Sequence, residues 1–198
     1  MTRVIAGSAR GRRLAVPPGD GTRPTSDRAR EGLFSSLENL VGPWAGRRVL
    51  DLYAGSGAIG LEAVSRGAVH ALLVESDPRT VRVIAANVAS TGLVAAEPRA
   101  GRVERVVSAA RPAGSPTYDV VVADPPYALD AADLHAVVIA LQGGWLSAGA
   151  VLALERPTRG GEWEWPTGIT ALRSRRYGEA TFWYGRAAQP TAQPEEVR

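Results

Sequence analysis

The amino-acid sequence predicts an α/β fold of the Rossmann-like type, in which helices cover both faces of a mostly parallel sheet. Strand-like apolar runs alternate with helical patterns of about 10 to 15 residues from residue 47 onward, as in βαβ units. Gly55, Gly57 and Gly60 follow the first of these runs at G-x-G-x-x-G spacing. The most strand-like run ends on Asp124, directly before two prolines. Polar turns at strand ends are where open α/β sheets hold their ligands.

The first expected element is a β-hairpin extension in residues 1–25. Its sequence RVIAGSARGRRLAVP has two short apolar stretches around a middle rich in glycine and arginine. Because the segment is polar, we expect it to contribute little to the core and to turn its charge outward. The loop that follows contains Pro24, with Thr25 or Ser26 placed to cap a helix.

The main domain is expected to span residues 26–186 and to begin with a helix over about 26–41, where apolar residues recur at helical spacing. The expected strands are RRVLDLY, HALLVES, a weaker strand around 97–108, YDVVVAD, AVLALER and a final pair near 170–185. The expected helices are GAIGLEAVSRG, PRTVRVIAANVASTG and a segment near 130–142. The final pair of strands predicts an antiparallel hairpin at an edge of the sheet. The polar residues 187–198 are expected to form a disordered tail.

The composition excludes several kinds of site. The 198 residues suit one domain and contain no cysteine, so no disulfide, thiolate nucleophile or cysteine-ligated metal is expected. His70 and His135 are not spaced as metal ligands, and we expect no metal site. No apolar run approaches the roughly 20 residues that span a bilayer, and the N-terminus lacks a signal-peptide core. We expect a cytoplasmic monomer that does not bind membranes.

The glycine turn predicts a nucleotide-type cofactor. Its glycines allow a tight strand-to-helix turn that a ligand can approach closely. Glu75 ends the next strand, where a carboxylate can accept hydrogen bonds from both hydroxyls of a ribose. Asp51 ends the first strand, and a carboxylate beside a pyrophosphate would be repelled by about 1 kcal/mol at 4 Å in water. A cofactor with an ammonium and a sulfonium would be attracted, so the acid favours S-adenosylmethionine (SAM) over a dinucleotide.

The proline turn predicts a site for an amine. The two prolines fix the backbone after Asp124 and keep it out of a helix. Asp124 and the carbonyl of Pro125 can each accept one N–H of an exocyclic amine on a base, which positions it by preorganised electrostatics. Tyr127 can stack on a flipped base, an interaction worth about 1–3 kcal/mol. We expect this turn to lie beside the glycine turn, because the two strands should be neighbours.

The motifs DLYAGSGAIGLEA, VESD and ADPPY, in this order, resemble SAM-dependent amino-methyltransferases with the [DN]PP[YF] signature. RVIAGSARGRRLAVP and TRPTSDRAREGLF resemble more narrowly the bacterial RsmD family, from residue 3 to about 185. The resemblance implies methylation of the exocyclic N2 of a guanine in 16S ribosomal RNA, with that RNA or the small ribosomal subunit as partner. It implies a target-amine site formed by Asp124, Pro125, Pro126 and Tyr127. It implies a cofactor site formed by Asp51, Tyr53, Gly55, Ser56, Gly57, Glu75, Ser76 and backbone groups near Arg102.

The RPTSDR segment looks like the stretch that closes over cofactor and target in this family. The chain departs from many methyltransferases after the third strand, where Gly101 and Arg102 replace an acid or asparagine that holds the adenine amino group. We expect backbone groups near Arg102 to hold the adenine instead.

Arginines cluster at the start of the chain. Residues 1–30 contain seven arginines against Asp20 and Asp27, a net charge of +5, while the remaining 16 arginines and 18 carboxylates give −2. The chain has no lysine, so every cation is a guanidinium, which grips phosphates and stacks on bases. We expect ribosomal RNA phosphates to contact Arg3, Arg10, Arg12 and Arg13, and Arg23 and Arg28 to lie nearer the active site.

Three other functions remain open from the sequence. The DPPY turn also serves N6-adenine methyltransferases of DNA or RNA, although a sequence-specific DNA enzyme usually needs an added recognition domain. A nucleotide-binding module without catalysis would leave Asp124 without a purpose at its strand end. A nicotinamide-dependent oxidoreductase is disfavoured by Asp51 and by the lack of a residue suited to relay a hydride.

Overall fold

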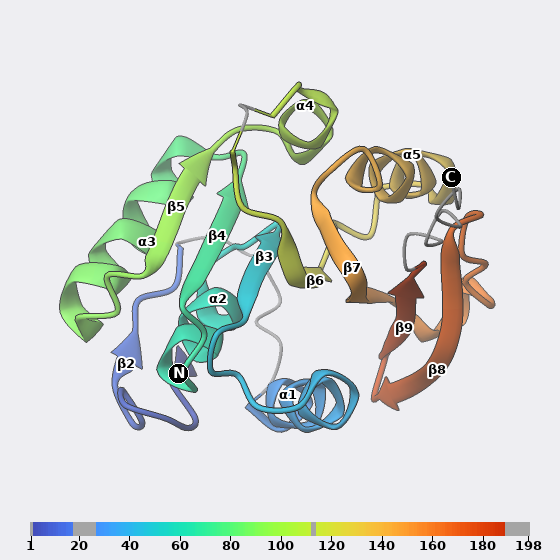
Figure 1. The fold of residues 1–198 in the computed structure, drawn as a ribbon. Coiled ribbons are helices and arrows are strands. Elements are labelled where there is room, and N and C mark those ends of the chain that lie inside the picture. The colour runs from blue at the N-terminus through green and yellow to red at the C-terminus, as the bar shows by residue number, and fades with distance from the viewer. Residues whose placement is uncertain (1, 18–26, 112–113, 189–198) are drawn as a thin grey trace, which may run out of the picture.

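A seven-stranded sheet forms the centre of the protein in the computed structural model, which describes residues 2–17, 27–111 and 114–188 (Figure 1). The strand order is β5-β4-β3-β6-β7-β9-β8. The strands are β3 (Arg48–Leu52), β4 (His70–Glu75), β5 (Ala96–Ala100), β6 (Tyr118–Ala123), β7 (Leu146–Pro157), β8 (Ile169–Tyr177) and β9 (Ala180–Ala187). The predicted Rossmann-like α/β fold is confirmed.

The sheet reverses its winding direction at β3. The chain builds outward through β4 and β5 on one side of β3 and through β6 and β7 on the other, with all these neighbours parallel. β8 and β9 form the predicted antiparallel hairpin at the edge of the sheet, with β8 outermost and β9 between β7 and β8. The carboxyl ends of β3 and β6 therefore border the switch point, where open α/β sheets bind their ligands.

Helices cover both faces of the sheet (Figure 1). One core lies under α1 (Asp27–Val41), α2 (Ala58–Ser65) and α3 (Pro78–Thr91), and the other under α4 (Val103–Ser108) and α5 (Ala131–Leu141). A short 3-10 turn, η1 (Thr158–Gly160), follows β7. Each buried strand reads as a nearly continuous apolar run because both its faces are covered. In the part of the chain that the structure describes, no helix is long and apolar enough to cross a membrane.

Helix α3 begins and ends where its sequence signals lie. Asp77 caps its start and accepts hydrogen bonds from the backbone N–H groups of Arg79 (3.0 Å) and Thr80 (3.3 Å). Pro78 occupies the first turn, where its missing N–H costs nothing. Gly92 ends the helix in the left-handed conformation with φ of 74°. These caps place Glu75 and Ser76 at a rigid strand-to-helix junction.

The segment 97–108 contains the expected weaker strand, β5, and also the helix α4, which the sequence reasoning missed. Only its first part pairs with β4, and residues from Val103 onward form α4. The valines of this helix, which suggest a strand by their β-branching, are spaced so that Val103, Val106 and Val107 face the core under α4 and α5. Burial on that face outweighs the local preference for a strand.

The N-terminal hairpin is confirmed, with β1 (Thr2–Arg3) paired antiparallel to β2 (Arg13–Leu14). The expectation that it contributes little to the core is wrong, because Val4, Ala9 and Leu14 are buried in the core under α1, α2 and α3. These three apolar residues belong to the same core cluster. The proposed domain boundary near residue 25 and the tail from 189 lie outside the described residues.

The hairpin is held by the polar residues of α2. The buried carboxylate of Glu62 accepts hydrogen bonds from the backbone N–H groups of Ile5 (2.6 Å) and Ala6 (2.9 Å). It also pairs with Arg66 at 2.8 Å. The hydroxyl oxygen of Ser65 accepts a hydrogen bond from the N–H of Ala9 at 3.0 Å. A buried glutamate on a helix of the main domain thus fixes an extension more than fifty residues away in sequence.

Candidate active site

The two predicted turns lie next to each other at the switch point of the sheet. The glycine turn follows β3 and the proline turn follows β6, which pair in parallel with Leu52 opposite Ala123. The backbone N–H of Asp124 points to the carbonyl of Leu52 at 3.4 Å, so the two turns leave the sheet together. The predicted juxtaposition of the cofactor turn and the amine turn is therefore present.

The glycines of the first turn are required by its geometry. Gly55 and Gly57 have φ of 53° and 77°, a conformation that other residues adopt only with strain. A Cβ on Gly60 would lie 2.7 Å from Cγ of Leu73, so the glycine lets α2 pack closely on β4. A Cβ on Gly55 would meet nothing within 4 Å, which leaves the turn open on that side. The turn therefore suits the close approach of a ligand to the backbone.

Asp51 holds the start of α2. The residue is buried, and its Oδ2 accepts a hydrogen bond from the backbone N–H of Gly60 at 2.9 Å. Burial, reinforced by the charges of Asp124 and Glu75, raises the pKa of Asp51 well above its usual value. The sequence predicts that this carboxyl lies in the cofactor crevice, where its charge favours SAM over a dinucleotide. The structure adds a local role in capping α2, and contact with the cofactor stays a prediction.

Glu75 clamps the glycine turn to the end of β4. Its Oε2 accepts a hydrogen bond from the N–H of Gly55 at 3.0 Å, across twenty residues of sequence. Its Oε1 accepts from the backbone N–H groups of Ser76 (2.7 Å) and Asp77 (3.0 Å) and from the Ser76 hydroxyl (3.2 Å). A carboxylate has about four lone-pair sites, so Oε2 can still accept from a ribose hydroxyl.

Asn87 joins the glycine turn to the N-terminal segment, a link that the sequence reasoning missed. This buried side chain donates from Nδ2 to the carbonyl of Ser56 at 2.9 Å and to the carbonyl of Ala15 at 2.9 Å. Its Oδ1 accepts the N–H of Ala15 at 2.8 Å. The sequence did contain a signal for this link, because Asn87 is a polar residue at a position of α3 where the helical spacing places buried residues. The contact guides the chain after β2 toward the cofactor side of the sheet.

Tyr53 and Arg102 both contact Glu104 at the start of α4. Tyr53 has a positive φ of 60° without being glycine, and its hydroxyl donates to Oε1 of Glu104 at 3.1 Å. Burial and the charge of Glu104 raise the pKa of Tyr53, so it remains a neutral donor. Arg102 is largely exposed, and its Nε lies 3.5 Å from Oε2 of Glu104. A strained residue held by a neighbouring helix is a common feature of ligand sites.

Solvent exposure differs from residue to residue along the proline turn. Asp124 is half-buried, Pro125 is buried and Tyr127 is 51% exposed. The carbonyl of Pro126 accepts the N–H of Leu129 at 2.9 Å and closes a tight turn. Arg156 of β7 donates from Nη1 to the carbonyl of Leu129 at 2.9 Å and ties the turn to the sheet. The turn therefore combines a fixed backbone with an exposed aromatic ring, as a stacking site requires.

Glu155, at the end of β7, is a site residue that the sequence reasoning missed. It is 7% exposed, and its charge acts on that of Asp124 in the neighbouring strand. Together, Asp51, Glu75, Asp124 and Glu155 place a carboxyl near the end of four adjacent parallel strands. Among the described residues they do not form a group that could hold a metal ion. The signal in the sequence was a glutamate at the end of an apolar strand, AVLALER.

The predicted RNA-binding arginines divide into two groups. Arg10, Arg12 and Arg13 are exposed on the hairpin, and Arg12 reaches the carbonyl of Ser90 near the end of α3. This end of α3 lies at the amino edge of the sheet, away from the proline turn. Arg3 pairs with Asp27 at 3.3 Å, while Arg28 is exposed in the first turn of α1. Arg23 and most of the RPTSDR segment lie outside the described residues.

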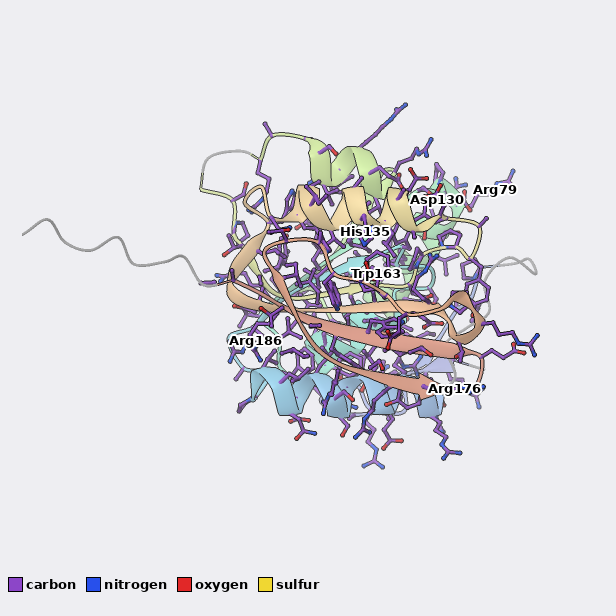
Figure 2. All side chains as sticks on the ribbon, turned by 90° about the vertical axis from the view of Figure 1, so that its right-hand side faces the viewer. Arg79, Asp130, His135, Trp163, Arg176 and Arg186 are labelled. Carbon is purple, nitrogen blue, oxygen red and sulfur yellow. The ribbon has the colours of Figure 1, made fainter. Side chains whose placement is uncertain are left out.

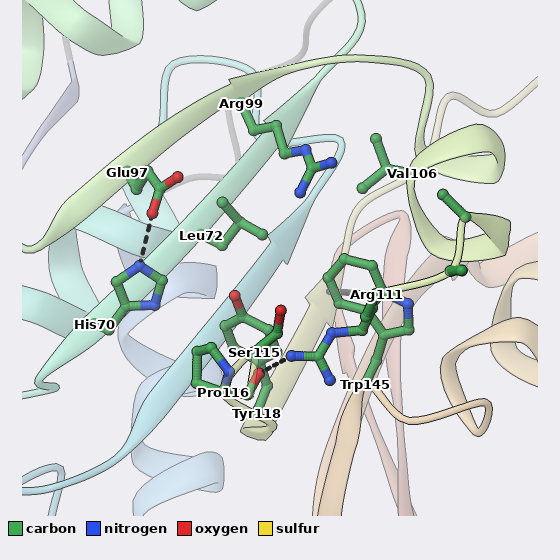
Figure 3. A pocket seen from close by; sticks show the side chains of 12 residues that line it. His70, Leu72, Glu97, Arg99, Val106, Arg111, Ser115, Pro116, Tyr118 and Trp145 are labelled. Atoms are coloured by element: carbon green, nitrogen blue, oxygen red, sulfur yellow. Dashed lines mark hydrogen bonds and ion pairs between the residues drawn. The ribbon is translucent and has the colours of Figure 1, made fainter. Parts of the chain in front are cut away.

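A separate pocket of about 210 Å³ lies at the opposite edge of the sheet (Figure 3). His70 and Tyr118, which line it, are the first residues of β4 and β6, whereas the predicted site lies at the last residues of these strands. The guanidinium of Arg111 lies over the ring of Trp145 at 4.9 Å, and His70 faces Glu97 at 3.1 Å. None of the predicted site residues lines this pocket.

The residues around the glycine turn fit SAM. The turn is open at Gly55, Glu75 offers a carboxylate oxygen with spare acceptor capacity, and Tyr53 offers an apolar ring beside it. These groups suit a ribose and an adenine, and the neighbouring carboxyls suit a cationic methionine moiety. A pyrophosphate fits less well, because the carboxyl of Glu75, which accepts the N–H of Gly55, would repel it.

Known proteins share both the sequence and the fold of this chain. The family model "Conserved hypothetical protein 95" matches residues 2–186. The chain is 34% identical over 192 residues to Ribosomal RNA small subunit methyltransferase D of Escherichia coli (strain K12), covering 94% of this chain and 91% of the relative. The solved structure of the putative methyltransferase yhhF from Escherichia coli has a TM-score of 0.80 at 30% identity, covering 95% of this chain and 98% of that one.

A putative methylase of Haemophilus influenzae, at 26% identity, has a TM-score of 0.75 and covers 95% of this chain and 99% of its own. These likenesses span the hairpin, the glycine turn and the proline turn alike. The chain belongs to the Conserved hypothetical protein 95 family, which is the RsmD family that its motifs resemble.

Proposed function

We propose that this protein is a SAM-dependent methyltransferase that methylates the exocyclic N2 of a guanine in the 16S ribosomal RNA of the small subunit. One observation carries the proposal: the glycine turn after β3 and the Asp124 turn after β6 leave neighbouring strands at the switch point of the sheet. A cofactor on the first turn would face an amine held on the second. The relative named as a small-subunit ribosomal RNA methyltransferase supports the choice of substrate.

The cofactor would be held by the glycine turn, Glu75 and the start of α4. When bound, SAM supplies an electrophilic methyl group, and its sulfur keeps the electron pair of the broken carbon–sulfur bond. Glu75 holds the turn through Gly55 and has an acceptor site for a ribose hydroxyl. The backbone N–H groups at the start of α4 and the ring of Tyr53 would hold the adenine.

The proline turn would position the base. Asp124 and the carbonyl of Pro125 each accept one N–H of the amine, which directs the nitrogen lone pair toward the methyl group. Tyr127, which is exposed on the turn, stacks on the base. When nitrogen gains the methyl group it must lose one proton, which the carboxyl group of Asp124 could accept. The turn therefore orients the amine first and takes up its proton afterwards.

We infer that the RNA contacts arginines at two ends of the molecule. The exposed hairpin group, Arg10, Arg12 and Arg13, lies at the amino edge of the sheet. A second exposed group, Arg159, Arg175 and Arg176, follows β7 and ends β8. In the strand register, Arg176 of β8 and Arg156 of β7 both lie opposite Thr181 of β9. Because Arg156 lies beside the proline turn, this group borders the edge of the sheet where the parallel strands end, which we call the active edge. Figure 2 shows Arg176 at the same edge as Asp130, with Arg186 at the opposite edge.

The test is to map the modified base. Purified protein is incubated with SAM carrying a labelled methyl group and either free 16S RNA or small subunits from a strain lacking its own enzyme. The RNA is then digested, and its nucleosides are separated by mass spectrometry. We expect labelled N2-methylguanosine. Labelled N6-methyladenosine would instead support the adenine methyltransferase, and no transfer to either substrate would contradict the proposal.

A further inference from the structure

The pocket of about 210 Å³ lies at the amino edge of the sheet, where the parallel strands begin, and the proposed methyl transfer does not use it (Figure 3). β4, β5 and β6 line it together with α4 and the segment that follows this helix. The glycine turn and the proline turn lie at the other ends of these strands, roughly 20 Å away for six residues. The pocket is smaller than the roughly 300–1,000 Å³ of sites for drug-sized ligands, so it suits a small group.

A row of aromatic rings lines this pocket. The ring centroids of His70 and Tyr118 are 6.0 Å apart, and those of Tyr118 and Trp145 are 6.1 Å apart. The guanidinium of Arg111 continues the row at 4.9 Å from the ring of Trp145. Tyr118 and Trp145 are buried, and the indole N–H of Trp145 donates to the carbonyl of Val107 at 3.0 Å. The row is therefore fixed, and its last ring keeps water from one side of the guanidinium.

Arg111 is held in place while its charge stays available. Its Nη1 donates to the carbonyl of Gly144 and its Nη2 to the carbonyl of Pro116. Both acceptors are neutral, and Arg111 forms no ion pair with a carboxylate among the described residues. A guanidinium has five N–H donors, so most of them remain for a ligand. A preorganised guanidinium of this kind suits the oxygens of a phosphate.

Arg99 and Arg111 enter the pocket from opposite sides (Figure 3). Arg99 lies opposite Val74 in the register of β5 and β4, and Val74 faces the core under α4 and α5. Arg99 is exposed and forms no ion pair within the described ranges. Glu97 supplies the carboxylate of the described lining and lies 3.1 Å from Nε2 of His70. Two guanidiniums therefore share the pocket with one carboxylate, which has a partner of its own.

The charges around Tyr118 have the sign that an anion requires. Burial raises the pKa of Tyr118, so its hydroxyl stays a neutral donor. The charges of Arg111, Arg99 and Arg48 all oppose this rise. Glu97 is the carboxylate that acts in the other direction. A concave site in which cations outnumber acids attracts anions.

We propose that this pocket binds a phosphate group between Arg99 and Arg111, over the ring of Tyr118. The exposed hairpin arginines lie at the same edge of the sheet, because Arg12 reaches the carbonyl of Ser90 near the end of α3, the helix that leads into β5. An RNA backbone that follows this edge would supply the phosphate, and a free nucleotide carries the same group. RNA is the source that the proposed function favours, and only this choice rests on that function. A phosphate held here would position the RNA without reading its bases.

The phosphate site is tested first without RNA or SAM. Inorganic phosphate and uridine monophosphate, whose base has no exocyclic amine for the proline turn, are titrated into the protein while NMR follows the indole N–H of Trp145. We expect a saturable shift with both. Arg99→Gln should weaken binding by at least about 10-fold, as expected for a lost hydrogen bond to a charged group. Arg111→Lys keeps the charge but loses the planar fork, so it should also bind more weakly than the wild type.

The matched control is Arg105→Gln, which removes the same charge from an exposed position of α4 outside the pocket. This variant should bind phosphate as the wild type does. If the Trp145 signal shifts with neither probe, or if Arg99→Gln and Arg105→Gln bind phosphate equally well, the proposal is overturned.

The source of the phosphate is tested by RNA affinity across a salt series. If RNA supplies it, the slope of log K against log salt should be lower in Arg99→Gln than in Arg105→Gln by roughly 0.7–0.9, one phosphate contact. Equal slopes in the two variants would overturn RNA as the source, and saturable binding of uridine monophosphate would then assign the pocket to a free nucleotide. Failure of the proposed function looks different: the wild type would transfer no methyl group to RNA, while the phosphate titration would be unaffected.

Discussion

Glu75 shows how much a single strand-end carboxyl does in this protein. Its position after the second strand was enough to predict a ribose acceptor from the sequence. Its hydrogen bond to Gly55 was not predictable, because it depends on how closely the glycine turn returns to β4. Asp51 is similar, since its place in the motif was evident but its burial was not. Single site residues could be predicted from their position at the end of a strand. Their hydrogen-bond partners could not, because these depend on how two elements pack against each other.

The residue-scale prediction concerns Glu75→Ala. We expect SAM affinity to fall by about 10- to 150-fold, because hydrogen bonds to a charged acceptor are lost. Glu75→Gln should lose less, since one oxygen can still accept from Gly55. Calorimetric titration measures both, with Glu97→Gln, an exposed glutamate of β5, as the control. An affinity for SAM equal to that of the wild type in Glu75→Ala would show that β4 does not border the cofactor.

At the scale of elements, the periodic helices and the apolar strands were predictable because each has a strong local signal. The segment after β5 was not, because the valines of α4 suggest a strand by type and a helix by spacing. The hairpin was predicted as a hairpin, but its contribution to the core was missed. Its three buried apolar residues are too few to mark an apolar face, and its anchor, Glu62, lies on another element.

The element-scale prediction is that Glu62→Ala releases the hairpin. Two backbone N–H groups lose their acceptor and Arg66 loses its buried partner, so we expect a loss of about 3–5 kcal/mol in the free energy of unfolding. Hydrogen exchange at Ile5 and Ala6 should accelerate more than exchange in the central strands. Glu38→Ala, at an exposed position of α1, is the control. Unchanged exchange in the hairpin would show that β1 and β2 are held by apolar contacts alone.

At the scale of the whole molecule, carboxyls lie near the carboxyl ends of the parallel strands, and exposed arginines lie at both edges of the sheet. The sequence predicted the basic start of the chain but not the second group at the end of β8, whose arginines are scattered among strand residues. The amino edge, where the hairpin arginines lie, is one strand length from the proline turn, roughly 20 Å for six residues. An RNA that reaches Asp124 would have to cross the molecule to contact both groups.

The whole-molecule prediction compares two triple variants. Replacing Arg10, Arg12 and Arg13 by alanine should weaken RNA binding and reduce the slope of log K against log salt by roughly 0.7–0.9 for each lost phosphate contact. The same change at Arg159, Arg175 and Arg176 should act similarly if RNA also follows the active edge. SAM affinity should stay constant in both, since the arginines lie off the cofactor turn. RNA affinity across a salt series measures the slopes, and a variant with the wild-type slope has lost no phosphate contact.

The central claim is that the Asp124 turn holds the amine while the neighbouring glycine turn holds the cofactor. Single-turnover methyl transfer by Asp124→Ala, with SAM affinity measured on the same protein, tests this claim most directly. We predict that transfer falls by at least about 10²–10³-fold, the cost of losing a preorganised electrostatic contact, while SAM affinity is nearly unchanged. Asp124→Asn should be milder, because its amide oxygen still accepts one N–H. A rate for Asp124→Ala above about a tenth of the wild type would contradict the claim.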